Sequence, residues 1–132
     1  MPRADWPLLR GRPRIEIVFT RISDRSALIR QLLGDTGAGS AQSAFDLVLR
    51  EAECIDFGQI LGYQAVLAGA YSGHFSVYLL HVEMPALGFS RDVRAVAVPT
   101  PPAAFDGIAC FSFLNQFTYD NFGDPARFGL EV

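Results

Sequence analysis

The sequence has no lysine among its 132 residues, and it has only two cysteines and two histidines. Without a lysine amine the chain cannot form a Schiff base or bind phosphate with a P-loop lysine. Cys54 and Cys110 are too few and too far apart for a disulfide scaffold or a zinc knuckle, so we expect reduced thiols in or near the core. His74 and His81 lack a third ligand at metal spacing. Carboxylates, hydroxyls and backbone amides are therefore the available chemical groups, and we expect no metal and no cofactor.

Long apolar runs and basic stripes are also missing. No apolar run approaches the roughly 20 residues of a membrane-spanning helix, and residues 1–14 lack the apolar segment of a secretory signal. The net charge is −3 and the pI is near 5.2, which argues against a nucleic-acid partner. The composition, half hydrophobic and 19% charged, excludes disorder for the bulk of the chain. We expect a cytoplasmic protein that binds neither membranes nor nucleic acid.

The first 13 residues differ in composition from the rest. They carry three prolines and three arginines, and their only sizeable apolar side chains are Trp6, Leu8 and Leu9. Proline fixes φ and removes a hydrogen-bond donor, so such a segment lies over a surface or a sheet edge more readily than inside a sheet. The sequence predicts an extended N-terminal arm over residues 1–13 and one domain over residues 14–132.

The domain has the pattern of an all-β protein. Ile15, Ile17 and Phe19 alternate with other residues and predict the first strand. Residues 26–33 suit a helix by propensity, but their short apolar run ending in Gly34 favours a buried strand. Residues 43–53 predict a short helix. Further strands separated by glycine and proline turns indicate a barrel or sandwich with one or two short helices and no repeat.

Asp35-Thr36-Gly37-Ala38 is the segment on which a chemical argument rests. An aspartate on a glycine turn after a buried strand is costly unless its oxygens accept backbone amide hydrogen bonds. Gly37 lacks the side chain that would keep a second backbone or a substrate at a distance. The turn can present a carboxylate to a bound water, or Asp35 can simply form a local Asx turn. These residues alone leave both interpretations open.

Three segments together carry a family resemblance. Residues 32–38, Leu-Leu-Gly-Asp-Thr-Gly-Ala, are similar to a catalytic loop that usually reads as an apolar pair followed by Asp-Thr-Gly-Ala. Residues 64–78, with two glycines, resemble a hairpin flap that covers substrate. Residues 105–114 resemble an apolar-apolar-glycine segment that precedes a short helix. In this order they resemble the retropepsin-like aspartic peptidases, and the resemblance covers residues 14–132.

The resemblance implies a closed acid-protease-like barrel that forms one lobe of a homodimer. It implies an aspartic endopeptidase in which Asp35 from each protomer activates one water, without metal or covalent intermediate. Thr36 would cross-link the two catalytic loops through its hydroxyl, Gly37 would accept close backbone approach, and Ala38 matches the retroviral type of loop. The flap over a peptide or protein substrate would comprise Gly69, Ala70, Tyr71, Ser72, Gly73 and His74.

Two departures from the family pattern leave alternatives open. Gly34 stands where relatives usually have a bulky apolar residue, which predicts looser packing behind the loop. Cys110 stands where the last segment usually has glycine. The alternative function is therefore a catalytically inactive domain of the same shape that binds peptides or mediates assembly. A third interpretation is an unrelated barrel in which Asp-Thr-Gly is only a turn. Asp106, also followed by glycine, is interpreted as structural.

Overall fold

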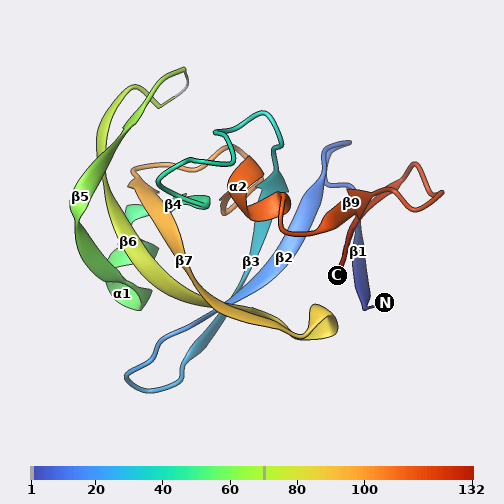
Figure 1. The fold of residues 1–132 in the computed structure, drawn as a ribbon, viewed down its shortest axis with the longest axis horizontal. Helices are drawn as coiled ribbons and strands as arrows, with labels where there is room; N and C mark the ends of the chain where they lie inside the picture. Colours follow the sequence, from blue (N-terminus) through green and yellow to red (C-terminus); the bar gives the residue numbers. More distant parts are fainter. Residues whose placement is uncertain (1, 70) are drawn as a thin grey trace.

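The computed structural model describes residues 2–69 and 71–132 of the chain (Figure 1). Its strands are β1 (Arg3–Pro7), β2 (Arg14–Thr20), β3 (Ala27–Gly34), β4 (Leu47–Arg50), β5 (Gln59–Leu67), β6 (Gly73–Met84), β7 (Phe89–Val98), β8 (Gly107–Ala109), β9 (Thr118–Asp120) and β10 (Arg127–Glu131). The helices are α1 (Glu51–Phe57), α2 (Phe111–Leu114) and a single 3-10 turn, η1 (Pro85–Leu87). No helix in these described ranges is long and apolar enough to span a bilayer.

Six strands close into a barrel. Neighbouring strands pair in the order β2-β3-β8-β4-β7-β6, and β6 pairs again with β2 to complete the ring. The pairings β3–β8 and β4–β7 are parallel, whereas the others in the ring are antiparallel. This closed barrel with two short α-helices confirms the fold class expected from the sequence.

The barrel interior is filled by the inward side of the strands. Ile15, Ile17 and Phe19 on β2 have no exposed surface, while Glu16 between them faces solvent. This alternation places every second side chain in the core, as a half-buried strand requires. The strands predicted from residues 14–20 and 26–33 are both present, as β2 and β3.

The helix predicted for residues 43–53 is wrong. Residues 47–50 form strand β4, which lies between β7 and β8, and only residues from Glu51 onward are helical. The physical reason is that Leu47, Val48 and Leu49 are all buried, so both faces of this strand are apolar and the period-2 signal is lost. The helix α1 starts where acidic residues Glu51 and Glu53 suit a helix N-terminus.

A separate three-stranded sheet joins the two ends of the chain. Its order is β1-β10-β9, with β10 in the centre (Figure 1). Part of the predicted N-terminal arm thus forms an antiparallel edge strand, in the register Asp5↔Gly129. The division of the chain at residue 13 remains a prediction.

The hairpin of β5 and β6 extends beyond the barrel wall and rises above one end of it (Figure 1). Among the described strands β5 pairs only with β6, and its register shifts between Ile60 and Gln64. Such a bulge bends and twists a strand. Figure 1 shows the far end of β5 at the same end of the barrel as the turn that follows β3.

Candidate active site

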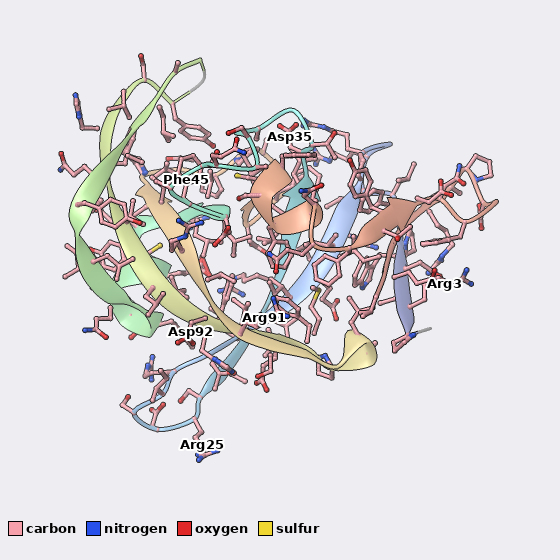
Figure 2. The ribbon with its side chains drawn as sticks, viewed as in Figure 1. Arg3, Arg25, Asp35, Phe45, Arg91 and Asp92 are labelled. Carbon is pink, nitrogen blue, oxygen red and sulfur yellow. The ribbon has the colours of Figure 1, made fainter. Side chains whose placement is uncertain are left out.

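Asp35 lies at the point where β3 leaves the barrel. β3 pairs in parallel with β8 up to Gly34↔Ala109, and the Asp35 N–H then donates to the carbonyl oxygen of Ala109 at 3.0 Å. The residue is half-buried. Figure 2 shows it on the loop above α2. The buried strand thus delivers a carboxylate to the barrel end without enclosing it.

The Asp-Thr-Gly-Ala segment forms a tight turn around this carboxylate. The Gly37 N–H donates to Asp35 Oδ1 at 3.0 Å, and the Ala38 N–H donates to the Asp35 carbonyl oxygen at 3.2 Å. A Cβ on residue 37 would lie 3.3 Å from Asp35 Oδ1. The local Asx geometry is therefore present, and it orients a carboxylate that still reaches solvent. Thr36 is exposed on the outside of the turn.

The turn is also anchored from the C-terminal part of the chain. The Phe111 N–H, at the start of α2, donates to the Ala38 carbonyl oxygen at 2.9 Å. β8 and α2 together therefore hold both ends of the turn. This is the structural role of the segment 105–114, and Asp106 contributes to it because its carboxylate accepts the Gln31 N–H on β3 at 2.8 Å.

The two departures from the family pattern are both accommodated by packing. A Cβ on Gly34 would lie 3.3 Å from the Phe128 ring and 3.4 Å from Pro13. These side chains fill the space behind the loop, so the expectation of looser packing there is wrong. Cys110 is fully buried. Burial, with smaller contributions from the Asp35 and Asp46 charges, raises the pKa of its thiol to about 12.

A cavity of about 390 Å³ opens between the Asp-Thr-Gly turn and the hairpin. The turn and the segment after it contribute Gly37, Ala38, Gly39, Ser43 and Phe45; the barrel contributes Val48, Ile108 and Cys110; the hairpin contributes Val66, Leu67, Ala68 and Tyr71. Nearly all of these side chains are apolar. The cavity therefore suits an apolar side chain held next to the Asp35 turn.

The residues predicted for the flap have different surroundings. Tyr71 is half-buried and faces the cavity, and burial raises the pKa of its phenol. Ser72 and His74 are exposed. Gly69 and Gly73 have φ values of +81° and +132°, a region that favours glycine. Ala70 lies outside the described residues. Of the described flap residues, only Tyr71 is brought to the cavity.

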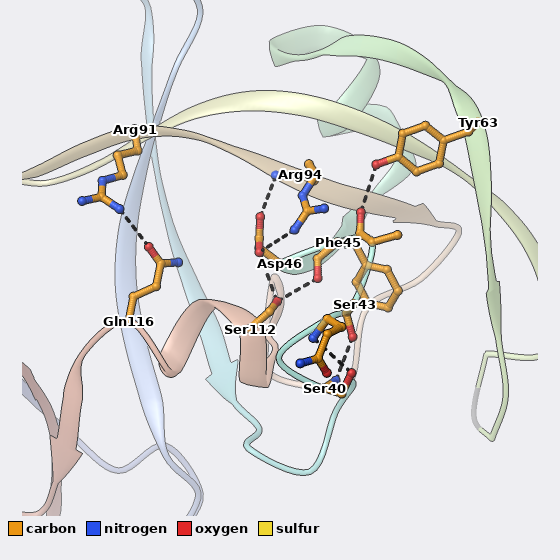
Figure 3. Close-up of polar contacts among 11 residues, drawn as sticks. Ser40, Ser43, Phe45, Asp46, Tyr63, Arg91, Arg94, Ser112 and Gln116 are labelled. Carbon is orange, nitrogen blue, oxygen red and sulfur yellow. Dashed lines mark hydrogen bonds and ion pairs between the residues drawn. The ribbon is translucent and has the colours of Figure 1, made fainter.

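Two aromatic residues near the site were not predicted from the sequence. Phe45 lines the cavity, and the Tyr63 hydroxyl on β5 donates to the Ala44 carbonyl oxygen at 3.0 Å (Figure 3). This hydrogen bond ties the base of the hairpin to the segment after the turn. Neither residue carries a local sequence signal, since Phe45 fell in a segment predicted as helix and Tyr63 reads as an ordinary strand residue.

Asp46 organises the same segment. Its carboxylate accepts the Arg94 N–H at 3.1 Å and the Ser112 hydroxyl at 3.1 Å, and it pairs with the Arg94 guanidinium at 3.3 Å (Figure 3). The Ser112 hydroxyl also lies 2.9 Å from the Phe45 carbonyl oxygen. Asp46 thus connects β4, β7 and α2, and it is a positioning group for the cavity wall.

A second polar cluster lies on the outer wall of the barrel. His81 Nδ1 is 3.0 Å from Asp92 Oδ1, and the Ser90 hydroxyl is 3.0 Å from His81 Nε2. His81 and Asp92 are direct partners across β6 and β7, so strand register explains these contacts. Within residues 2–69 and 71–132, no three potential metal-binding side chains gather into one site.

No protein-family model and no curated protein matches the sequence. Among solved structures, the chain is similar to a retropepsin-like aspartic protease from Rickettsia conorii. The two share 14% sequence identity with a TM-score of 0.62, and the match covers 97% of this chain and 89% of the other. At this identity the similarity concerns the fold. The chain therefore has the fold of a retropepsin-like aspartic protease.

Proposed function

We propose that this chain is one protomer of a homodimeric aspartic endopeptidase. The observation that carries the proposal is the half-exposed Asp35 carboxylate, held by the Gly37 N–H on a rigidly anchored turn beside an apolar cavity. A single carboxylate of this kind provides half of a general acid–base pair. The similar protein of the same fold is described as an aspartic protease.

The chemistry follows from like-charge repulsion. Two Asp35 carboxylates a few ångströms apart across a two-fold axis cannot both ionise cheaply, so one keeps its proton and the pair titrates as a unit. The ionised carboxylate takes a proton from a shared water as that water attacks the peptide carbonyl carbon. The protonated carboxylate donates to the carbonyl oxygen. No metal or covalent intermediate enters these steps.

The neighbouring residues take supporting roles in this proposal. Thr36 is exposed on the turn, where its hydroxyl can meet the turn of a second copy. Gly37 allows close approach of a second backbone. The β5–β6 hairpin covers the peptide, with Tyr71 against the cavity and the exposed His74 on its solvent side. The apolar cavity holds one side chain of the substrate.

Mixing wild-type protein with the Asp35→Asn variant tests catalysis and the shared site together. When all chains are dimeric, an equal amount of variant should reduce the cleavage rate per wild-type chain to about half, because half of the wild-type chains then have an inactive partner. An unchanged rate would show that one protomer acts alone. If the wild-type protein binds peptides without cleaving them, the chain is instead an inactive peptide-binding or assembly domain.

The pH dependence is a second readout of the proposed pair. One proton shared by two carboxylates gives a bell-shaped profile. Ala38 offers no hydroxyl to keep the carboxylate ionised in strong acid, so the maximum should be mildly acidic. Cleavage of a peptide measured across the acidic range checks this, and a rate that rises continuously down to about pH 2 would contradict it.

A further inference from the structure

The polar cluster on the outer barrel wall has the order of hydrogen bonds that activates a serine hydroxyl. His81 Nδ1 lies 3.0 Å from Asp92 Oδ1, and Ser90 Oγ lies 3.0 Å from His81 Nε2. A carboxylate only accepts, so Nδ1 carries the proton of the neutral ring, and Nε2 is left to accept from the Ser90 hydroxyl. A nucleophile, a base and a group that orients the base are thus connected in sequence.

Strand pairing brings these three side chains to one face of the sheet. His81 on β6 lies directly opposite Asp92 on β7, and Ser90 is two residues from Asp92, so all three point the same way. The main chain of Arg94, further along β7, bonds to Asp46 and hence away from β6. Because alternate residues bond to opposite sides, His81 and Asp92 form a non-hydrogen-bonded pair, in which side chains lie closer. The cluster is therefore held by the barrel sheet and not by a loop.

The main-chain N–H of Ser90 is available at the same place. By the same alternation it points away from β6, to the side on which β4 pairs with β7 only from Ala95 onward. Within the described part of the chain, no hydrogen bond joins this N–H to β4, to a neighbouring loop or to a side chain. The N–H of the nucleophile itself is an effective oxyanion donor, because it lies beside the attacking oxygen.

A small cavity opens beside Ser90. It measures about 170 Å³, and its lining includes Ser90 and Arg91 on β7 and Gln116 and Phe117 after α2. The Arg91 guanidinium donates to Gln116 Oε1 at 3.2 Å (Figure 3) and pairs with no carboxylate among the described residues. The cavity thus offers a positive charge near the nucleophile. Its volume, less than half that of the cavity beside the Asp35 turn, suits a short acyl group.

The other carboxylate next to Ser90 is engaged elsewhere. Glu83 lies opposite Ser90 on β6, and its Oε2 accepts the Thr20 hydroxyl on β2 at 2.9 Å. Because β2 and β7 flank β6 on opposite sides, this hydrogen bond draws the Glu83 carboxylate away from Ser90. Arg91 is then the charged side chain that shares the small cavity with Ser90.

We propose that Ser90, His81 and Asp92 form a second catalytic site, which hydrolyses esters of short carboxylic acids. Ser90 is the nucleophile and His81 the general base, and Asp92 is the positioning residue that orients the imidazole. This activity goes beyond the proposed peptidase, because it uses neither Asp35 nor the cavity beside the Asp35 turn.

The reaction balances with the groups of the cluster and one water. Ser90 Oγ bonds to the carbonyl carbon as its proton moves to His81 Nε2, and the Ser90 N–H and the Arg91 guanidinium hold the resulting oxyanion. The ester C–O bond then breaks, and the alcohol leaves with the proton from Nε2. A water next gives one proton to Nε2 while its oxygen bonds to the acyl carbon. The carboxylic acid leaves as the proton on Nε2 returns to Ser90 Oγ.

Hydrolysis of p-nitrophenyl acetate by the full chain tests the nucleophile and the base. Ser90→Ala and His81→Ala should each lower the rate of p-nitrophenol release at least about tenfold. Ser23→Ala removes another exposed serine hydroxyl, one that contacts no histidine among the described residues, and is the matched control that should keep the wild-type rate. A wild-type rate in the Ser90→Ala variant would assign hydrolysis to another surface group and overturn the proposal.

The positioning role of Asp92 has its own test. Asp92→Asn removes the carboxylate that holds the proton on Nδ1, so the ring can adopt the tautomer that cannot accept from Ser90, and p-nitrophenol release should fall about tenfold. Asp92→Glu restores a carboxylate and should recover part of this loss, which a merely structural role for Asp92 would not require. Equal rates in the wild type and the Asp92→Asn variant would overturn the assignment of Asp92.

Covalent labelling of the wild-type chain needs no variant. A fluorophosphonate should react at Ser90, because Oγ bonds to phosphorus, fluoride leaves and His81 takes the hydroxyl proton. Mass spectrometry of the digested protein locates the adduct. An adduct at Ser90 supports the site, whereas an unlabelled chain or an adduct on a different residue overturns it. A protein that cleaves peptides without taking the label overturns only this inference, and a labelled protein that cleaves no peptide overturns only the proposed function.

Discussion

Two cavities of nearly equal volume differ in the groups that line them. The cavity beside the Asp35 turn measures about 390 Å³, and no charged side chain lines it. The other measures about 410 Å³ and combines apolar residues such as Phe57 and Leu80 with charged groups, including Arg21 and Asp56, which pair at 2.6 Å. Volume does not distinguish them. What distinguishes them among the described residues is that the first lies beside the turn that holds Asp35, whose carboxylate contacts no basic side chain, whereas Asp56 and Asp92 at the second contact Arg21 and His81.

The largest expected effect contrasts one carboxylate from each region. Asp35→Asn should lower kcat/KM for a cleaved peptide by at least about a thousandfold, because the acid–base pair is lost. Asp92→Asn, at the second cavity, should leave kcat/KM unchanged. Steady-state kinetics on both variants checks this, with circular dichroism to confirm that each is folded. Equal losses would mean that the first cavity has no special role.

Filling each cavity is the next contrast. Ala38→Leu adds apolar volume beside the Asp35 turn and should lower kcat/KM about tenfold by excluding part of the substrate. Ser23→Leu adds similar side-chain volume at the second cavity and should not change kcat/KM. Peptide kinetics and thermal unfolding of both variants provide the measurement. An unaffected Ala38→Leu enzyme would place the substrate elsewhere.

Both regions contain a buried thiol, and the two thiols should have the same effect on the pH dependence of stability. Cys110 forms part of the first cavity, and Cys54 lies in α1, whose last residues line the second. Burial raises the pKa of each thiol from 9.0 to about 12. Each thiol has a higher pKa in the folded chain than in the unfolded chain. The free energy of unfolding is therefore undiminished below pH 9 and falls as the pH rises from 9 toward 12.

At pH 10 the loss should amount to roughly 1 kcal/mol per thiol relative to pH 8. Urea unfolding at the two pH values measures it. Cys54→Ala and Cys110→Ala should each remove about half of this difference in the free energy of unfolding between pH 8 and pH 10. This holds even if the variants are less stable than the wild type at pH 8. A pH dependence that survives in the double variant would assign it to other groups.

The smallest expected effect concerns the connection between hairpin and turn. Tyr63→Phe removes the hydrogen bond to Ala44 and should raise KM about two- to threefold while leaving kcat nearly unchanged, because the hairpin base is less well fixed over the cavity. Asp56→Asn, which breaks an exposed ion pair at the second cavity, is the matched control and should change neither constant. A fall in kcat alone would contradict this role for Tyr63.

The sequence predicted those parts of the fold that have a local pattern. β2 alternates and β3 is a short apolar run that ends in glycine, so both were placed correctly. β4 was missed because a strand buried on both faces has no period that separates it from a helix. Asp35 could be found because Asp-Thr-Gly is contiguous. Phe45 and Tyr63 could not, since they reach the cavity only through tertiary contacts.

The anchoring of the Asp35 turn affects when the site can form. The turn depends on Ala109 and Phe111, which follow it by more than 70 residues, and β3 has no parallel partner until β8 is available. Pairings of such high sequence separation form late and slowly in folding. On the ribosome, the first two-thirds of the chain would therefore lack an ordered Asp35 turn. A newly made chain should acquire a competent half-site only after its C-terminal strands have been added.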